Sequence, residues 1–444
     1  MNKENKMGIL PVPGLVISMS LPIMVSMLVQ SLYNIVDSIF VAKISEEALT
    51  ATSIAYSAQM LQIAVAVGTG VGMNALVSQQ LGAKRFQEAN EAATTGLYLS
   101  LISSIPFILW GIFGTEAFIR LFASDPAIIL DGTTYLRICQ IFSAGIFLGT
   151  FSQRLLQATG RTFLSMLAQM AGAVVNLILD PLMIFGIGCF PEMGIAGAAV
   201  ATVLGQWVAA VIGLILNYVQ NQEIHFVFKG FCFKRANLVR IYKVGAPTIL
   251  MQAFGSIMVG IMNMILVMFS TTAVAFFGAY YKLQSFLFMP MHGLGQGSLP
   301  IIGYNYGAGN RERVRETCKT SIFVGAIIGA VGTAVFFLFP RQLLLMFSAG
   351  EVMLVIGVPA LRIISLTFVF ASVTMIIGYT VSGLGNGMVN MIATALRQLV
   401  LLLPFVFLLG KTGGISLVWY AFWISEIVAF GFAVYELFRK LRSL

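Results

Sequence analysis

The sequence predicts an all-α polytopic membrane protein with twelve transmembrane helices arranged as two parallel six-helix lobes. Three observations predict this fold class: the composition, a succession of long apolar runs, and an internal repeat at one fixed offset. Hydrophobic residues make up 58% of the 444-residue chain and charged residues only 10%, whereas soluble domains carry about 25% charged residues. A chain of this composition requires a lipid bilayer as its solvent.

The apolar runs of the first half predict the first six spans, because each is long enough to supply the roughly 20 residues that a helix needs to cross a bilayer. The runs are continuous and do not alternate at a period of two, which favours helices over barrel strands. Polar or charged breaks separate them, namely AKISEE, QLGAKRFQE, EAFIRLFASDP, TGR and GCFPEM. The predicted spans are residues 15–41, 51–79, 92–115, 130–158, 162–187 and 194–219.

The second half predicts six further spans by the same reasoning. Its breaks are TT, YNYGAGNRER, RQLLLMFSAGE, LGNG and KT. The predicted spans are residues 244–270, 273–303, 319–340, 353–383, 388–410 and 413–437. Almost no length remains for a soluble domain.

An internal repeat relates the two halves. Shifting the sequence by 225 places Pro22 on Pro247, Gly160 on Gly385, LRI at 136–138 on LRI at 361–363, and GTGVG at 68–72 on GLGQG at 293–297. Because each half contributes an even number of spans, the two halves run in the same sense and are expected to be related by an axis along the membrane normal. The predicted organisation is an N-terminal lobe of residues 1–219, a cytoplasmic linker of 220–243 and a C-terminal lobe of 244–444.

The glycine-rich stretch GTGVGMN is similar to a phosphate-binding loop in composition alone. It lies inside a predicted span, no GKT or GKS follows it, and its counterpart recurs 225 residues later. Small residues at this density let membrane helices approach closely or bend. We therefore expect a packing role here and no nucleotide site.

The basic residues predict the orientation of the chain. The net charge of +9 could suggest nucleic acid, but the lysines and arginines concentrate in alternate connections. If the N-terminus is cytoplasmic, the outside loops carry only Lys43, Arg120, Arg341 and Lys411. This asymmetry places both termini in the cytoplasm, predicts a multi-pass protein of the plasma (inner) membrane, and argues against nucleic acid as a partner.

Three acidic residues lie well inside predicted spans: Asp37, Asp180 and Glu426. An ionised group there costs about 2.5–3.5 kcal/mol on insertion scales and usually faces the bundle interior or a cavity. Asn176 shares a helical face with Asp180, four residues away, and Tyr33 and Asn34 give the helix of Asp37 a similar polar stripe. Both aspartates are expected in the outer half of the N-terminal lobe.

Two carboxylates held together in a low-dielectric interior can load and release a proton, or hold a sodium ion when both are ionised. The alternative is structural, in which both acids only make hydrogen bonds to Asn176, Tyr33 or the backbone. The shift of 225 places Met262 opposite Asp37 and Phe405 opposite Asp180, so the pair belongs to the first lobe alone. Cation coupling is therefore expected in the N-terminal half.

Glu426 has two interpretations. Lys282 and Arg397 are basic residues within spans of the same half, and an ion pair between Glu426 and one of them would satisfy both partners. A role in substrate binding is the other interpretation.

Taken together, these motifs resemble the multidrug and toxic compound extrusion (MATE) transporters, in particular their bacterial MepA-like branch. The resemblance covers essentially the whole chain and is carried by SLYNIVDSIFVAK, ALVSQQLGAKR, LLQATGRT, NLILDP and the second-half echo IIGYNYGAGN. It implies a twelve-helix, two-lobe exporter that expels organic cations in exchange for protons or sodium ions.

The resemblance also implies roles for particular residues. Asp37, Asp180 and Asn176 match the cation site of the N-terminal lobe. Tyr135 and Gln153 match polar positions on the fourth helix that join that network, and Pro22 matches a proline at which the first helix bends.

One departure from the family concerns the second half. Many relatives carry acids in their seventh and tenth helices, whereas the corresponding spans here contain none, which puts a sodium site of that type in doubt.

The sequence therefore predicts a cation-coupled antiporter, driven by protons or sodium, that exports lipophilic, often cationic small molecules by alternating access. A flippase of lipid-linked oligosaccharides is the alternative, with Lys282, Arg362 and Arg397 as its basic residues. An enzyme is not expected, because the two histidines are far apart and no nucleophile–base or metal constellation is present. We expect no cofactor and a monomer in the lipid bilayer.

Overall fold

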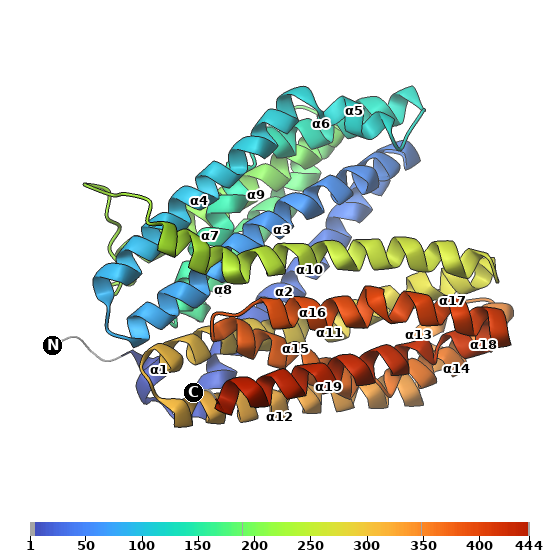
Figure 1. Cartoon of the computed structure of the whole chain (residues 1–444). Coiled ribbons are helices and arrows are strands. Elements are labelled where there is room, and N and C mark those ends of the chain that lie inside the picture. The colour runs from blue at the N-terminus through green and yellow to red at the C-terminus, as the bar shows by residue number, and fades with distance from the viewer. Residues whose placement is uncertain (1–4, 189, 348, 443–444) are drawn as a thin grey trace. The chain divides into compact units, whose positions relative to one another are not determined.

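The computed structural model describes residues 5–188, 190–347 and 349–442, and within these ranges the chain is helical and contains no strand (Figure 1). The helices of the first half are α1 (Lys6–Ile9), α2 (Val12–Ala42), α3 (Glu46–Gly82), α4 (Phe86–Phe113), α5 (Thr115–Arg120), α6 (Pro126–Ile141), α7 (Ala144–Ala158), α8 (Thr162–Ile184) and α9 (Ile195–Gln220). Those of the second half are α10 (Arg235–Val267), α11 (Thr271–Gly307), α12 (Arg311–Leu338), α13 (Pro340–Leu345), α14 (Glu351–Ser365), α15 (Phe368–Gly383), α16 (Met388–Ala395), the π-helical turn η1 (Leu396–Val400), α17 (Leu402–Gly413), α18 (Ile415–Val418) and α19 (Ala421–Arg442).

All twelve predicted spans are helical, and the all-α membrane fold is confirmed. Among the described residues, nine helices are long and apolar enough to cross a membrane, and the bent pair α14–α15 forms a tenth such span. The remaining two predicted spans are α11, which has 37 residues, and residues 130–158, which are divided between α6 and α7. The sequence did not predict this division, nor the 48° bend between α14 and α15.

The helix bounds repeat at the offset found in the sequence. α3, α4 and α5 begin and end 225 residues before α11, α12 and α13, and α2 and α10 end at equivalent residues. The break between α6 and α7 likewise corresponds to the bend between α14 and α15. The repeat detected from a few identical residues is therefore a repeat of local structure along most of each half.

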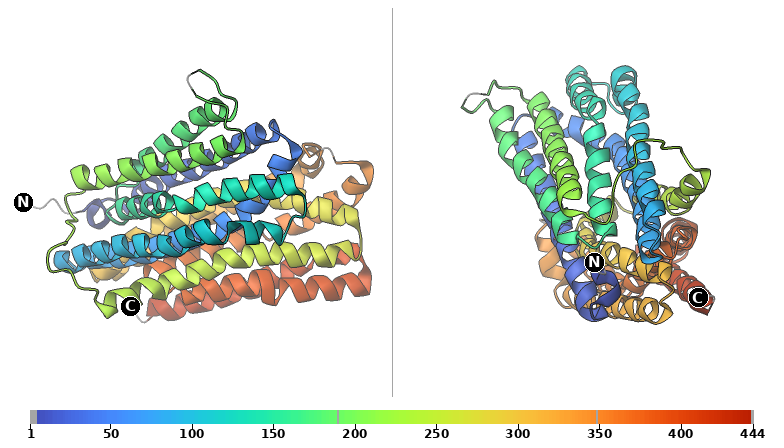
Figure 2. Two further views of the ribbon diagram at one scale, coloured as in Figure 1. Left: turned by 90° about the horizontal axis from the view of Figure 1, so that it is seen from above. Right: turned by 90° about the vertical axis from the view of Figure 1, so that its left-hand side faces the viewer.

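Packing divides the chain into two compact units, in each of which the helices lie side by side along much of their length (Figures 1 and 2). The first unit consists of the N-terminal residues through Asn5 together with Val25–Ile249. The second consists of Lys6–Met24 and Leu250–Leu444. These units differ from the lobe boundaries expected from the sequence, because α2 and α10 each contribute to both units.

Close contacts at the glycine motif explain why the start of α10 belongs to the first unit. A Cβ atom added to Gly72 of α3 would lie 2.1 Å from the carbonyl oxygen of Ile241, and one added to Gly68 would lie 2.7 Å from that of Gly245. The backbones of α3 and α10 therefore touch, as glycines spaced four apart allow. The packing role expected for GTGVG is present, and the stretch is helical throughout.

The equivalent contacts occur in the second unit between α11 and the start of α2. A Cβ atom at Gly297 would lie 2.6 Å from the Cα of Ser20, and one at Gly293 would lie 2.8 Å from the backbone nitrogen of Met24. The first helix of each half therefore begins against the second helix of the other half, and this exchange determines the boundaries of the units.

The predicted linker packs against the first unit. Within residues 220–243, the backbone amides of His225 and Val227 donate hydrogen bonds to the side-chain oxygens of Asn90 (2.8 Å) and Thr94 (3.0 Å) on α4. These hydrogen bonds pair backbone N–H groups that, in a non-helical segment, have no carbonyl one turn earlier to bond with.

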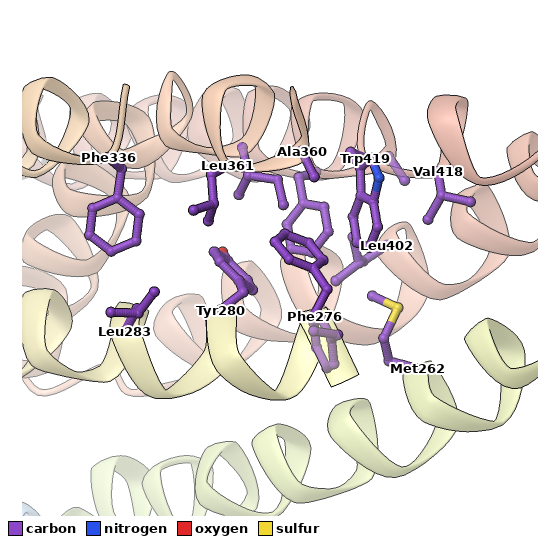
Figure 3. Close-up of a cluster of buried hydrophobic side chains, with 14 of the residues drawn as sticks. Met262, Phe276, Tyr280, Leu283, Phe336, Ala360, Leu361, Leu402, Val418 and Trp419 are labelled. Atoms are coloured by element: carbon purple, nitrogen blue, oxygen red, sulfur yellow. The ribbon is translucent and has the colours of Figure 1, made fainter. Parts of the chain in front are cut away.

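The cores of the two units differ in composition. In the first unit, a stripe of alanines on α3 at Ala48, Ala51, Ala55 and Ala58 lets α3 pack closely against its neighbours. In the second, aromatic side chains fill the space, and Figure 3 shows Phe276 of α11 beside Trp419. Their ring centroids are 4.9 Å apart in an edge-to-face arrangement.

We predict that Gly72→Leu destabilises the protein by about 1–3 kcal/mol or prevents its assembly, because a buried backbone contact leaves no space for a side chain. The measurement is thermal unfolding of the purified protein in detergent. Gly260→Leu in α10 is the matched control, since a Cβ at Gly260 meets no atom within 4 Å. Equal stability of the two variants would contradict the packing described here.

Candidate functional site

The two membrane aspartates of the first unit lie side by side. The carboxyl groups of Asp37 on α2 and Asp180 on α8 are within hydrogen-bonding range of one another. Asp180 is fully buried, with 0% of its surface exposed, and Asp37 is half-buried. Oδ1 of Asp37 and Oδ2 of Asp180 are both buried and have no hydrogen-bond donor among the described residues.

Asn176 connects this pair to α9. Its Nδ2 lies 3.5 Å from Oδ1 of Asp180 and 3.4 Å from Oγ1 of Thr202, and donates to both. The geometry follows from the close packing of α8 and α9, because a Cβ at Gly205 of α9 would lie 2.9 Å from the Cβ of Asn176. The absence of a side chain at Gly205 thus brings the amide of Asn176 within reach of Thr202.

A layer of hydroxyl and thiol groups surrounds the acids. The hydroxyl of Tyr135 on α6 hydrogen-bonds with Thr202, and Cys139, one turn later on the same helix, hydrogen-bonds with Tyr135 and Gln59. Tyr33 on α2 interacts electrostatically with both carboxylates. Five helices of the first unit therefore contribute to one polar cluster inside an apolar bundle.

The cluster has excess acceptors and no fixed positive charge. Among the residues that the structure describes, no lysine or arginine lies near enough to interact electrostatically with the carboxylate of Asp37 or Asp180. No group of three or more histidine, cysteine, aspartate or glutamate side chains there could hold a metal ion. Such a site can accept a proton between the two carboxyl groups, or a small cation that oxygen atoms coordinate.

A family model described as MatE matches residues 22–182 and 247–408, one match in each half of the repeat. The chain belongs to the MatE family. This confirms the family resemblance inferred from the sequence motifs. Members of the MatE family are transporters, so this protein is a multi-pass membrane transporter of small molecules and not an enzyme.

Relatives within the MatE family cover most of the chain. The multidrug export protein MepA of Staphylococcus haemolyticus is 24% identical over 427 residues, which is 95% of this chain and 93% of that protein. An FAD transporter of Shewanella oneidensis is 27% identical over 314 residues, covering 70% of this chain and 69% of that protein. A solved structure described as the outward-facing conformation of a multidrug resistance MATE family transporter of the MOP superfamily aligns over 100% of both chains, with a TM-score of 0.91 and 25% identity.

The structure of this MatE protein brings together most of the residues predicted for the cation site. Asp37, Asp180, Asn176, Tyr33 and Tyr135 all belong to the polar cluster. Their roles in transport stay predictions.

The other three predicted residues lie elsewhere. The side chain of Asn34 is exposed, and Gln153 is half-buried on α7, outside the hydrogen bonds of the cluster described above. Pro22 lies within α2, in the part of that helix that packs with the second unit. The roles implied for these residues by the family resemblance also stay predictions.

Sequence reasoning missed Thr202, Cys139 and Gln59. Cys139 was detectable, since it lies four residues after Tyr135 and therefore on the same helical face. Thr202 is one polar residue in the apolar stretch GAAVATVLG, and a threonine in a membrane helix commonly bonds to its own backbone. Nothing local in the sequence distinguishes it.

Glu426 of the second unit pairs with Arg397. The distance from Nε of Arg397 to Oε1 of Glu426 is 3.4 Å, and both side chains are largely buried. Lys282, the other partner considered from the sequence, is exposed. This pair is separate from the aspartate cluster, because it lies in the other unit.

We predict that Thr202→Val lowers the free energy of unfolding by about 1 kcal/mol, because the nearly isosteric substitution removes the hydroxyl shared by Asn176 and Tyr135. Thermal unfolding of the purified variant measures this. Thr50→Val provides the control, since the exposed Thr50 hydroxyl donates to the carbonyl of Glu46 one turn earlier in its own helix. A loss no larger than that of the control would show that the hydroxyl does not support the cluster.

Proposed function

We propose that this transporter is a cation-coupled antiporter that exports lipophilic, often cationic small molecules from the cell by alternating access. The observation that carries the proposal is the contact between Asp37 and Asp180 in a cluster to which no basic side chain of the described residues contributes. The relatives named as multidrug export proteins support the direction and the substrate class.

The coupling step follows from the electrostatics of the pair. Two ionised carboxylates in contact repel, and burial removes the water that would screen them. Binding of one cation relieves this repulsion, whereas its release restores it. A conformation that holds the two carboxylates in contact therefore binds a cation more tightly than one that separates them. This difference in affinity is the condition for an ion to shift a conformational equilibrium.

The available driving force is sufficient for concentrating a substrate. One elementary charge that crosses a potential of 100 mV releases about 2.3 kcal/mol. This corresponds to roughly a fiftyfold concentration ratio. The coupling ion is a proton or sodium: a proton can be shared between the carboxyl groups, and sodium can be held by oxygens of Asp37, Asp180 and their neighbours.

The flippase alternative receives little support from the embedded basic residues. A lipid-linked pyrophosphate needs several unpaired positive charges directed into a cavity. Lys282 and Arg362 are exposed, and the charge of Arg397 is opposed by Glu426, 3.4 Å away, so the three residues do not provide a cluster of unopposed positive charge. We therefore favour export of small molecules over translocation of a lipid-linked oligosaccharide.

We further propose that the protein is a monomer in the plasma (inner) membrane with both termini in the cytoplasm. The segment that connects the two halves contains five lysines and arginines between Lys229 and Lys243. Basic connections of this kind stay on the cytoplasmic side.

We expect Asp37→Asn and Asp180→Asn each to abolish gradient-driven efflux while the protein still folds and inserts, because an amide cannot exchange a proton or neutralise a cation. Efflux of a fluorescent lipophilic cation from reconstituted vesicles, with a proton gradient or a sodium gradient imposed separately, measures this and identifies the ion. Glu436→Gln, near the C-terminus of α19 and paired with Arg439, is a control in which efflux should persist. Unaltered export by both aspartate variants would refute the coupling role.

The orientation has a direct test, because Cys232 in the linker is exposed whereas Cys139 and Cys318 are buried. Cys189 lies outside the described residues and is replaced in this test by Cys189→Ser. In that variant, a membrane-impermeant maleimide should label inside-out vesicles and leave intact cells unlabelled. The reverse pattern would place the linker outside.

A further inference from the structure

The second unit contains a partly open cavity of about 230 Å³ beside the ion pair of Arg397 and Glu426. Half of its lining residues are phenylalanine, tyrosine or methionine, among them Phe288 and Met375, and the polar side chains of Gln284, Ser285 and Thr367 also contribute. Arg397, Gln398 and Glu426 also line it. The volume is smaller than the roughly 300–1,000 Å³ typical of sites for drug-sized ligands, which indicates a smaller ligand. A cavity that combines apolar side chains with convergent polar groups is typical of a binding site.

A π-helical turn places two consecutive polar residues on this cavity. α16 changes into η1 at Leu396, and η1 ends at Val400. In a regular α-helix, neighbouring residues diverge by about 100°, whereas a π turn is wider and redirects side chains. Arg397 and Gln398 both lie on the cavity lining. Isolated π turns in helices occur frequently at functional sites.

The ion pair is only half satisfied. The contact of 3.4 Å joins Nε of Arg397 to Oε1 of Glu426, while Nη1 of Arg397 and Oε2 of Glu426 are buried without a hydrogen-bond partner among the described residues. Glu426 is only 7% exposed. The guanidinium also lies over the ring of Phe288, with 5.7 Å between Cζ and the ring centroid.

This geometry differs from that of a structural ion pair. A buried arginine and carboxylate that serve stability usually form two parallel hydrogen bonds, because each unsatisfied charged atom is expensive. Here one donor and one acceptor of the pair have no partner among the described residues, and the unpaired Oε1 of Gln398 belongs to the same lining. His292, which also lines the cavity, does not supply the missing contact with its Nδ1, since that atom is paired with the hydroxyl of Tyr379 at 2.9 Å.

The arrangement is particular to the second half. The shift of 225 places Gly172 opposite Arg397 and Ala201 opposite Glu426. Neither charge therefore has a counterpart in the first half. The pair also lies in a different unit from Asp37 and Asp180.

We propose that this cavity is a binding site for a small aromatic zwitterion, about the size of an aromatic amino acid. The ligand's carboxylate accepts a hydrogen bond from Nη1 of Arg397, and its ammonium donates one to Oε2 of Glu426. Its ring packs against the apolar wall that includes Phe288 and Met375. A ligand with both charges completes both halves of the pair, whereas a ligand with one charge leaves the other half unsatisfied.

The test compares three probes with the same ring and chain: L-phenylalanine, 2-phenylethylamine and 3-phenylpropionate. Calorimetry on the full-length protein in nanodiscs, with no ion gradient, measures their binding. Because this measurement uses no ion gradient, it does not depend on coupling between ion and substrate. Absence of binding would therefore contradict this proposal and leave the proposed coupling untouched. We expect L-phenylalanine to bind about tenfold more tightly than either analogue, because each analogue loses one charge-assisted hydrogen bond.

Two variants identify the groups responsible. Arg397→Gln should reduce the affinity for L-phenylalanine to that for 2-phenylethylamine, and Glu426→Gln should reduce it to that for 3-phenylpropionate. Arg362→Gln is the matched control, because Arg362 is exposed, lies over Phe337 and is not among the residues that line this cavity. It should leave all three affinities unchanged.

Because removal of one member of a buried pair can prevent folding, the double variant Arg397→Gln/Glu426→Gln completes the set. It removes both charges while keeping side chains of similar size, and it should bind the three probes equally weakly. The proposal is overturned if the folded wild-type protein binds none of the probes or binds one analogue as tightly as L-phenylalanine. It is also overturned if the double variant retains the preference for the zwitterion.

Discussion

Contact between two carboxyl groups inside an apolar bundle is the constraint on which the first unit depends. Each ionised acid in a membrane span costs about 2.5–3.5 kcal/mol on insertion scales, and two in contact repel in addition. The surrounding helices reduce this cost by supplying donors, most directly through Asn176, and by placing hydroxyl groups of Tyr135 and Thr202 in the same cluster. Oδ1 of Asp37 and Oδ2 of Asp180 remain without a partner among the described residues, and it is at these oxygens that we propose the exchangeable ion binds.

The second unit accommodates buried charge differently. Arg397 and Glu426 have opposite signs and need no exchangeable ion. Their incomplete contact instead leaves one donor and one acceptor available to a molecule of matching charge. Aromatic rings dominate the packing around them, as at Phe276 and Trp419, whereas small alanines dominate α3 in the first unit. The two halves thus share helix bounds and differ in their chemistry.

Much of the fold follows from the sequence, because length, hydropathy and a repeat are properties of whole segments. The twelve helical segments and the offset of 225 are of this kind. The approach of Asp37 to Asp180 was predictable for another reason, because an acid within a membrane span usually faces the bundle interior. The exchange of α2 and α10 between the units was not predictable, since it depends on which backbones meet at Gly72 and Gly297. Thr202 was missed for a related reason: its neighbour on α8 is determined by three-dimensional packing and not by spacing in the chain.

The exchange of first helices has a consequence for biosynthesis. The boundary between the units falls between Met24 and Val25 in α2 and between Ile249 and Leu250 in α10, two positions that are 225 residues apart. Each boundary follows a proline, Pro22 or Pro247, by two residues. Residues 241–249 lie against the backbone of α3 at Gly68 and Gly72, so α3 acquires this set of packing contacts only after the start of α10 has been synthesised. Neither unit can therefore be completed from the residues of one half alone.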